Sequence, residues 1–127
     1  PYLSPTLYED APNNTRAREE IFGPVLSIIT ADSDEAAIKI ANESDYGLTA
    51  SVFSANTNRA LRAARELRAG TVTVNCFGEG DITTPFGGYK HSGFGGRDNG
   101  LYAHDQYCEV KTIWIDLSDA NARDRFS

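Results

Sequence analysis

The sequence has 127 residues, of which 40% are hydrophobic and 24% are charged, a composition typical of one soluble globular domain. Its net charge of −6 disfavours nucleic acid and anionic membranes as partners, because both are negatively charged. No apolar run approaches the roughly 20 residues of a membrane-spanning helix, and no signal-peptide pattern opens the chain. Cys76 and Cys108 lack the spacing of a zinc site or disulfide framework. A cytoplasmic protein is therefore expected.

The first 30 residues combine a loop with strand-like runs. Residues 1–18 are rich in proline, asparagine and aspartate, which predicts an extended loop with a short strand at residues 6–8. Residues 25–30 form a continuous apolar run, typical of a strand covered on both faces. The intervening residues 19–25 place two carboxylates and an aromatic ring at the entrance of that strand. This stretch fits either an acidic loop leading into the core or a ligand site.

Helices and strands then alternate. Short oxygen-bearing side chains at residues 32–35 predict the start of a helix, and Gly47 predicts its end. A strand is expected at residues 48–53. Asn56 or Thr57 can cap the helix that follows.

The second predicted helix carries two stripes of side chains. The apolar stripe consists of Ala60, Leu61, Ala64 and Leu67. Arginine recurs at every third position, at residues 59, 62, 65 and 68, which fits a solvated basic edge better than a phosphate-binding face. Gly70 is expected to end the helix, and residues 71–75 to form another strand. The alternation of strands and helices predicts an α/β fold built from βαβ units.

Residues 76–100 hold most of the glycines, and a loop of this length is typical of a functional segment. A short helix is expected at residues 98–105, a strand at 110–117 and a polar tail at 118–127. The last strand is apolar on much of both faces. It therefore needs a partner edge, either in the same domain or in another chain.

Three candidate sites, for a nucleotide phosphate, a metal ion and a nucleophile, each lack a residue that the chemistry requires. Gly88 and Gly93 have the spacing of a P-loop, yet Phe94 stands where the phosphate-binding lysine is required. His91 and His104 have no further ligand at metal-site spacing, so no metal is expected. Cys76 follows a strand directly but has no histidine base nearby, which favours a small buried side chain over a nucleophile.

Five further motifs stand in order along the chain: Glu-Glu-Ile-Phe-Gly-Pro-Val at 19–25, Asp-Tyr-Gly-Leu at 45–48, Ala-Gly-Thr-Val-Thr-Val-Asn at 69–75, Pro-Phe-Gly-Gly-Tyr-Lys at 85–90 and Glu-Val-Lys-Thr-Ile at 109–113. NAD(P)-dependent aldehyde dehydrogenases carry these motifs in the same order, and the chain resembles that family over residues 2–117. Gly80-Asp81-Ile82 and Arg97-Asp98 look most like the γ-glutamyl-γ-aminobutyraldehyde dehydrogenase group.

The resemblance implies a division of the chain into three parts. Residues 1–97 correspond to the end of the family's catalytic domain, and residues 98–117 to a connecting helix and the oligomerisation strand. Residues 118–127 correspond to a flexible tail. The family's nucleophilic cysteine and general-base glutamate precede the matching region, and the chain opens on Pro1 without methionine, so we expect a C-terminal fragment with no catalytic residue of its own and no dehydrogenase activity.

The resemblance also implies half of a cofactor site. Glu20 falls where the family places the carboxylate that binds the nicotinamide ribose, and Phe22 where it packs an aromatic ring against that ribose. An ionised carboxylate has two acceptor oxygens that suit a vicinal diol. NAD or NADP is therefore the expected cofactor of the full-length parent, with none expected to bind the fragment alone.

The expected substrate of the parent is an aldehyde. By resemblance, Phe86 lies beside the aldehyde tunnel, and residues 77–84, here called the mouth loop, form part of its entrance. Glu79, Gly80 and Asp81 stand where related enzymes for apolar aldehydes carry aromatic side chains. The two carboxylates fit recognition of a cationic aminoaldehyde, with a merely solvated acidic loop as the equal alternative.

Homo-oligomerisation through the C-terminal strand is also implied. The expected interface residues are Arg97, Glu109, Lys111, Ile113 and Ile115. Arg97 and Glu109 flank the turn into this strand, where an arginine–carboxylate pair can be bidentate. The alternative function is a non-catalytic oligomerisation or binding module derived from the family.

Overall fold

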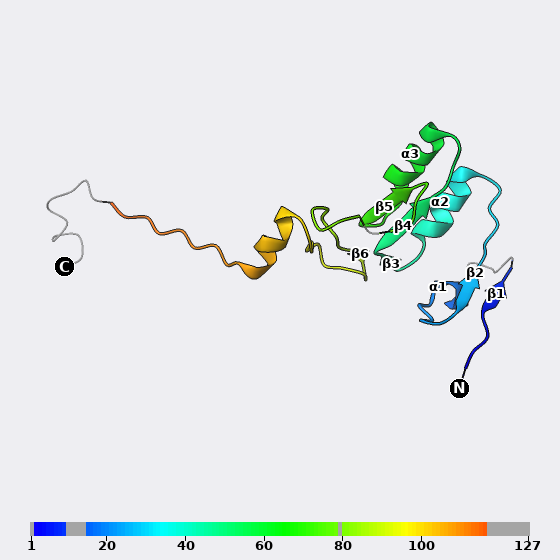
Figure 1. The fold of residues 1–127 in the computed structure, drawn as a ribbon. Coiled ribbons are helices and arrows are strands. Elements are labelled where there is room, and N and C mark those ends of the chain that lie inside the picture. The colour runs from blue at the N-terminus through cyan, green and yellow to red at the C-terminus, as the bar shows by residue number, and fades with distance from the viewer. Residues whose placement is uncertain (1, 10–14, 79, 117–127) are drawn as a thin grey trace.

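The computed structural model describes residues 2–9, 15–78 and 80–116. Its first strand pair consists of β1 (Thr6–Tyr8) and β2 (Val25–Ser27), which run parallel with Thr6 opposite Val25. The short helix α1 (Thr15–Arg18) lies between them in the sequence (Figure 1). The strand predicted at residues 6–8 is confirmed, whereas the helix within the predicted N-terminal loop was not anticipated.

Helix α2 (Asp34–Asn42) begins as predicted and ends earlier than predicted. The hydroxyl of Ser33 accepts a hydrogen bond from the amide of Ala36 and caps the helix. At the other end, the Lys90 ammonium donates to the carbonyls of Asn42 and Ser44, at 2.8 and 2.6 Å. The predicted stop at Gly47 was therefore wrong, because a distant lysine caps the helix five residues before that glycine.

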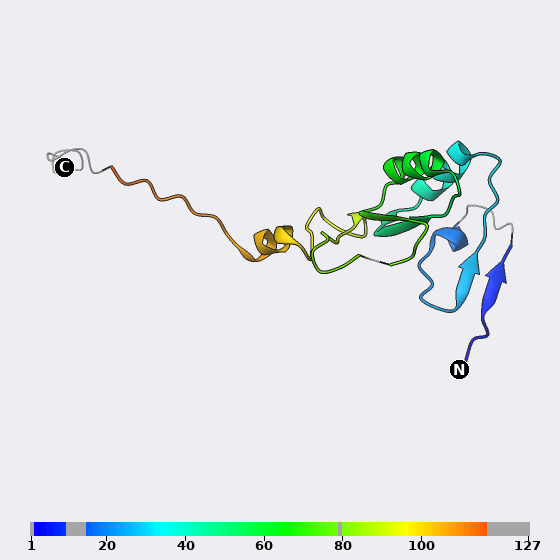
Figure 2. The ribbon, with the colours of Figure 1, turned by 45° about the horizontal axis from the view of Figure 1, so that its top comes forward.

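The central unit is a parallel β-α-β motif. Strand β4 (Thr49–Val52), helix α3 (Thr57–Glu66) and strand β5 (Thr71–Val74) follow one another, with Val52 opposite Val74 in the sheet. The Asn56 side chain accepts from the amide of Arg59, so the predicted cap of α3 is confirmed. Figure 2 shows α2 and α3 side by side on one face of this sheet.

The arginines of α3 are exposed, as predicted for a solvated edge, and two of them also join the helices. Arg59 makes two hydrogen bonds to Asp34 of α2, and Arg62 pairs with both Glu35 and Glu66. The pairs with Asp34 and Glu35 connect the N-terminal turn of α2 to α3, and the Arg62–Glu66 pair lies within α3. Solvent-exposed pairs of this kind orient the helices more than they stabilise them.

The Gly-rich segment folds back onto the start of the central unit. Strand β3 (Tyr46–Gly47) pairs antiparallel with β6 (Tyr89–Lys90), and a 3₁₀ helix, η1 (Leu101–Tyr107), follows the loop. The helix expected at residues 98–105 begins later because Asn99 and Gly100 are left-handed, with φ of 60° and 62°. Residues 108–116 are extended and run away from the rest of the molecule (Figures 1 and 2).

Little apolar surface is buried within the described residues. The buried apolar side chains are those of Ile38 and Ala60, where α2 and α3 meet the sheet. Strand β2 pairs with β1, and β4 with β5, but no ladder joins these two pairs among the described strands. The apolar run at residues 25–30 was predicted to be covered on both faces; Leu26 and Ile28 are instead exposed, because no described element covers them.

Candidate functional site

The stretch at residues 19–25 forms a strained bend ahead of β2. Phe22 has a φ of 53°, a left-handed conformation that is rare for a bulky side chain, and its ring is 91% exposed. The amide of Thr6 donates to the carbonyl of Pro24 at 2.8 Å, which anchors the bend to β1. The structure therefore holds an aromatic ring out into solvent at the cost of backbone strain, a feature that clusters at ligand sites.

Glu20 lies at the junction of two hollows. One, of about 540 Å³, is lined by the bend itself and by the start of β2, including Phe22 and Val25. The other, of about 380 Å³, brings Glu20 together with Asn42, Gly47 and Ser92 from distant parts of the chain. An exposed carboxylate beside an exposed aromatic ring has the chemistry needed to accept hydrogen bonds from a diol and to pack against its ring.

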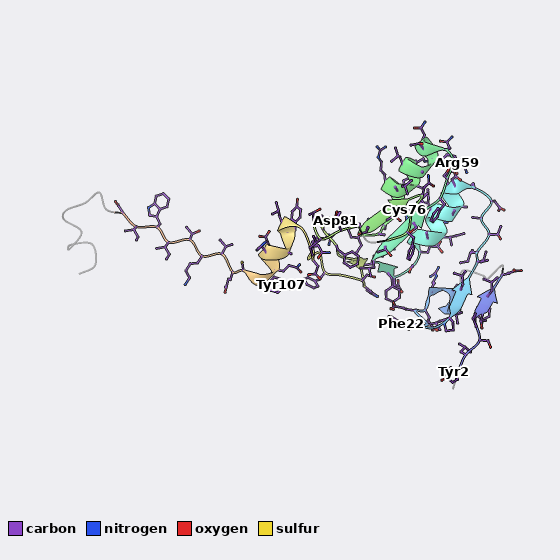
Figure 3. All side chains as sticks on the ribbon, in the orientation of Figure 1. Tyr2, Phe22, Arg59, Cys76, Asp81 and Tyr107 are labelled. Atoms are coloured by element: carbon purple, nitrogen blue, oxygen red, sulfur yellow. The ribbon has the colours of Figure 1, made fainter. Side chains whose placement is uncertain are left out.

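The Gly-rich segment provides the second group of candidate residues, around Asp81 (Figure 3). One oxygen of Asp81, Oδ1, accepts from the amide and hydroxyl of Thr83, at 2.8 and 2.5 Å. The Thr84 hydroxyl in turn accepts from the amide of Asp81. The Thr83 hydroxyl and amide, followed by Thr84, lower the pKa of Asp81 below its ordinary value, so this exposed carboxylate is ionised at neutral pH.

The remaining predicted pocket residues are placed around this turn. Gly80 precedes Asp81 with a φ of 91°, and Glu79 lies outside the described residues. Phe86 is half-buried, and its amide and carbonyl pair with the carbonyl and amide of Asp98, at 2.7 and 2.6 Å. The hollow beside this part of the loop is lined by Ile82 and Thr83, by residues 98–100 and by residues of η1, not by the residues around Glu20.

The predicted interface residues lie in the extended segment and just before η1. Glu109, Lys111, Ile113 and Ile115 are all exposed, as is their neighbour Trp114, at 90%. Arg97 lies 5.5 Å from the ring centroid of Tyr89, donates to the carbonyl of Gly96 and is not paired with Glu109 in the described chain.

Sequence reasoning missed the residues that hold these groups in place. Lys90 caps α2, and the side-chain amide of Asn42 connects α2 to the end of α3 through Glu66 and Arg68. These contacts span long separations in sequence and leave no local pattern. The turn around Asp81 does have a local sequence pattern, because an aspartate followed by threonine two residues later is typical of an Asx turn.

The described residues hold no group of three or more metal-ligating side chains. Cys76, which was predicted to be a small buried side chain, is exposed at the end of β5, and Cys108 is also a free thiol. None of the helices described here is long and apolar enough to span a membrane.

The family model that describes the aldehyde dehydrogenase family matches residues 1–113. The aminoacetaldehyde dehydrogenase of Pseudomonas aeruginosa is 57% identical over 92% of this chain and 24% of its own length. The NADP/NAD-dependent aldehyde dehydrogenase PuuC of Escherichia coli is 50% identical over 91% of this chain and 23% of its own length. The chain thus spans about a quarter of the length of the curated relatives it matches.

Solved structures give the same picture. The crystal structure of an indole-3-acetaldehyde dehydrogenase complexed with NAD+ superposes with a TM-score of 0.84 at 53% identity, over 91% of this chain and 23% of that one. An aldehyde dehydrogenase of Mycobacterium tuberculosis complexed with NAD+ also gives a TM-score of 0.84, at 39% identity, over 93% of this chain and 24% of that one.

Proposed function

The chain belongs to the aldehyde dehydrogenase family, and from this membership we propose that it supplies one part of a site at which an aldehyde is oxidised to a carboxylic acid with NAD or NADP. It spans about a quarter of its relatives, so the activity belongs to a longer polypeptide or assembly that contains it. The exposed ring of Phe22, held in a left-handed backbone beside Glu20, is the observation that carries this proposal.

Glu20 and Phe22 have the chemistry of a nicotinamide-riboside site. The Glu20 carboxylate is exposed and borders both hollows, so it can accept hydrogen bonds from two neighbouring hydroxyls. The Phe22 ring offers an apolar face beside it, and its strained backbone fixes where that face lies. The bound cofactor would accept the hydride from the substrate, while these two residues orient its ribose and ring.

A matched pair of variants tests this site in a hybrid enzyme, in which this chain replaces the matching quarter of the full-length P. aeruginosa relative. We expect Glu20→Gln to raise the KM for the cofactor by about tenfold, because a charge-assisted hydrogen bond is lost. Glu19→Gln removes an adjacent exposed carboxylate and should leave that KM within about twofold. Equal effects of the two variants would refute the role of Glu20.

We further propose an aminoaldehyde as substrate, recognised by the mouth loop. Asp81 is ionised and exposed, and the P. aeruginosa relative is named for aminoacetaldehyde. In the hybrid enzyme, Glu79→Gln combined with Asp81→Asn should raise the KM for an aminoaldehyde about tenfold more than the KM for a neutral aldehyde of the same length. A similar rise for both aldehydes would leave these carboxylates as solvated loop residues.

The extended segment supports a homo-oligomer as the assembled state. Its side chains at residues 110–116 are exposed on both sides, and its backbone forms no strand ladder within the described chain. A segment of this kind pairs with a partner edge. We propose that a second copy of the chain supplies that edge, and that the 127-residue chain alone produces no NADH from an aldehyde.

A further inference from the structure

Three backbone hydrogen bonds connect the end of the mouth loop and the residues just after it to the turn that precedes η1. The amide of Gly100 donates to the carbonyl of Ile82 at 2.8 Å, and Phe86 and Asp98 exchange two further bonds. These contacts enclose residues 82–86 from one side. The position of this part of the loop therefore depends on residues 98–100, which we call the clamp.

The clamp has a backbone conformation that its sequence makes possible. Asn99 and Gly100 are both left-handed, and Gly100 combines a φ of 62° with a ψ of −169°, which is open only to glycine without strain. A Cβ atom at Gly100 would lie 2.9 Å from the carbonyl oxygen of Thr83 and 3.5 Å from the Pro85 ring. The absence of a side chain is thus what lets the loop lie against the clamp.

This contact reaches the Asp81 carboxylate through a single residue. The Thr83 carbonyl oxygen lies where a side chain at Gly100 would meet it, and the amide and hydroxyl of Thr83 donate to Asp81 Oδ1. A displacement of Thr83 would therefore move or release the carboxylate. The clamp can therefore affect the position of Asp81 without touching a substrate.

We propose that Asn99 and Gly100 are positioning residues that set the affinity of the mouth loop for cationic aldehydes by fixing Thr83 and, through it, Asp81. The inference rests on the proposed substrate recognition by Asp81. It adds that recognition depends on the turn that holds the loop, and not on the Asp81 carboxylate alone. It also joins the pocket to η1, since Gly100 is the residue that precedes this helix.

Gly95 provides a matched control for a test on Gly100. Both glycines are left-handed and lie in the same segment, but a Cβ atom at Gly95 would meet nothing within 4 Å. Gly95→Ala and Gly100→Ala thus both impose backbone strain, while only the second pushes on the mouth loop. Asn99→Gly keeps the left-handed turn, and Asn99→Val, with a β-branched side chain, opposes it.

The first measurement is amide hydrogen exchange on the 127-residue chain. We expect the Phe86 and Asp98 amides to be protected, and Gly100→Ala and Asn99→Val to speed their exchange at least about tenfold. Gly95→Ala and Asn99→Gly should change it by less than about twofold. If these amides are unprotected in the unaltered chain, or if Gly95→Ala and Gly100→Ala speed their exchange equally, the proposal that the clamp holds the loop is wrong.

The second measurement is steady-state kinetics of the hybrid enzyme. Gly100→Ala should raise the KM for an aminoaldehyde about tenfold, with kcat and the KM for a neutral aldehyde within about twofold. A purely structural role would shift both aldehydes alike and would refute the specificity role. A hybrid enzyme that oxidises no aldehyde would count against the proposed function, while the exchange result would still decide whether the clamp holds the loop.

Discussion

Asp34 and Arg59 form a two-point ion pair between the first turns of α2 and α3. Arg59 Nε lies 2.7 Å from Oδ2 and Nη2 lies 2.5 Å from Oδ1, which is the planar geometry that favours arginine over lysine. The hydrogen bonds and charge of Arg59, with a smaller effect of Arg62, lower the pKa of Asp34 from its ordinary value of 3.8. The folded chain thus prefers the ionised carboxylate.

The lowered pKa gives the pair a defined pH dependence. A carboxylate whose pKa is lower in the folded state adds stability above its unfolded pKa and loses it as pH falls through the folded value. We expect Asp34→Asn to lower the thermal midpoint at pH 7, and this difference from wild type to shrink below pH 3.8. Thermal melts followed by circular dichroism across that range would measure it.

Asp32→Asn is the control, because Asp32 is exposed and lies just before the helix cap. It should not reproduce the pH-dependent difference. A difference between Asp34→Asn and wild type that stays constant down to pH 2 would show that the pair does not connect the helices in solution.

Lys90 connects the end of α2 to β6. Its ammonium donates to the carbonyls of Asn42 and Ser44, two acceptors at the C-terminal end of α2, where a positive charge is favourable. Lys90 has a φ of 52°, so its backbone is strained in the position that makes these contacts possible. Within the Gly-rich segment, Lys90 is therefore held by the end of α2, and residues 82–86 are held by the clamp.

Removal of this ammonium should loosen the connection. Lys90→Met keeps the apolar stem of the side chain and removes its charge. We expect it to lower the free energy of unfolding by about 1–2 kcal/mol, because the two hydrogen bonds from the ammonium to the carbonyls at the end of α2 are lost. Lys39→Met, in the last turn of the same helix, is the control and should cost less than about 0.5 kcal/mol. Urea unfolding of the three proteins compares them. Equal losses for the two variants would contradict the capping role.

Local patterns predicted the elements well, and distant contacts decided where they end. The cap at Asn56, the strand at residues 6–8 and the β-α-β order all follow from neighbouring residues, and the structure confirms them. The end of α2 and the start of η1 do not, because they depend on Lys90 and on the left-handed turn before Leu101. The same limit applies to the site. Family motifs pointed to Glu20 and Asp81, whereas the hydrogen bonds between the clamp and residues 82–86 required the fold.

The described chain leaves most of its large apolar side chains exposed. Parallel sheets normally have both faces covered, yet helices cover β4–β5 on one face, and β1–β2 pairs with no other described strand. Val110 and Trp114 of the extended segment are 92% and 90% exposed. Surfaces of this extent drive association.

The 127-residue chain should therefore self-associate, in part through the extended segment. We expect Ile113→Lys to reduce the mass measured by light scattering, because it replaces a large exposed apolar side chain of that segment with a charge. Thr112→Lys adds the same charge on the opposite side and removes no large apolar group, so it should have a smaller effect. If both variants associate as strongly as wild type, the extended segment is not the contact.

The Asn99–Gly100 turn also bears on how the protein ages chemically. Asparagine before glycine deamidates when the glycine amide nitrogen attacks the side-chain carbonyl, releases ammonia and forms a succinimide that opens to isoaspartate. Here that nitrogen donates to the Ile82 carbonyl, which hinders the attack. We expect Asn99 to deamidate slowly while the mouth loop stays in place and faster in Asn99-containing variants that release it. The deamidation rate of Asn99, measured by mass spectrometry on stored samples without any substrate, would then report how often the contact between the clamp and the mouth loop opens.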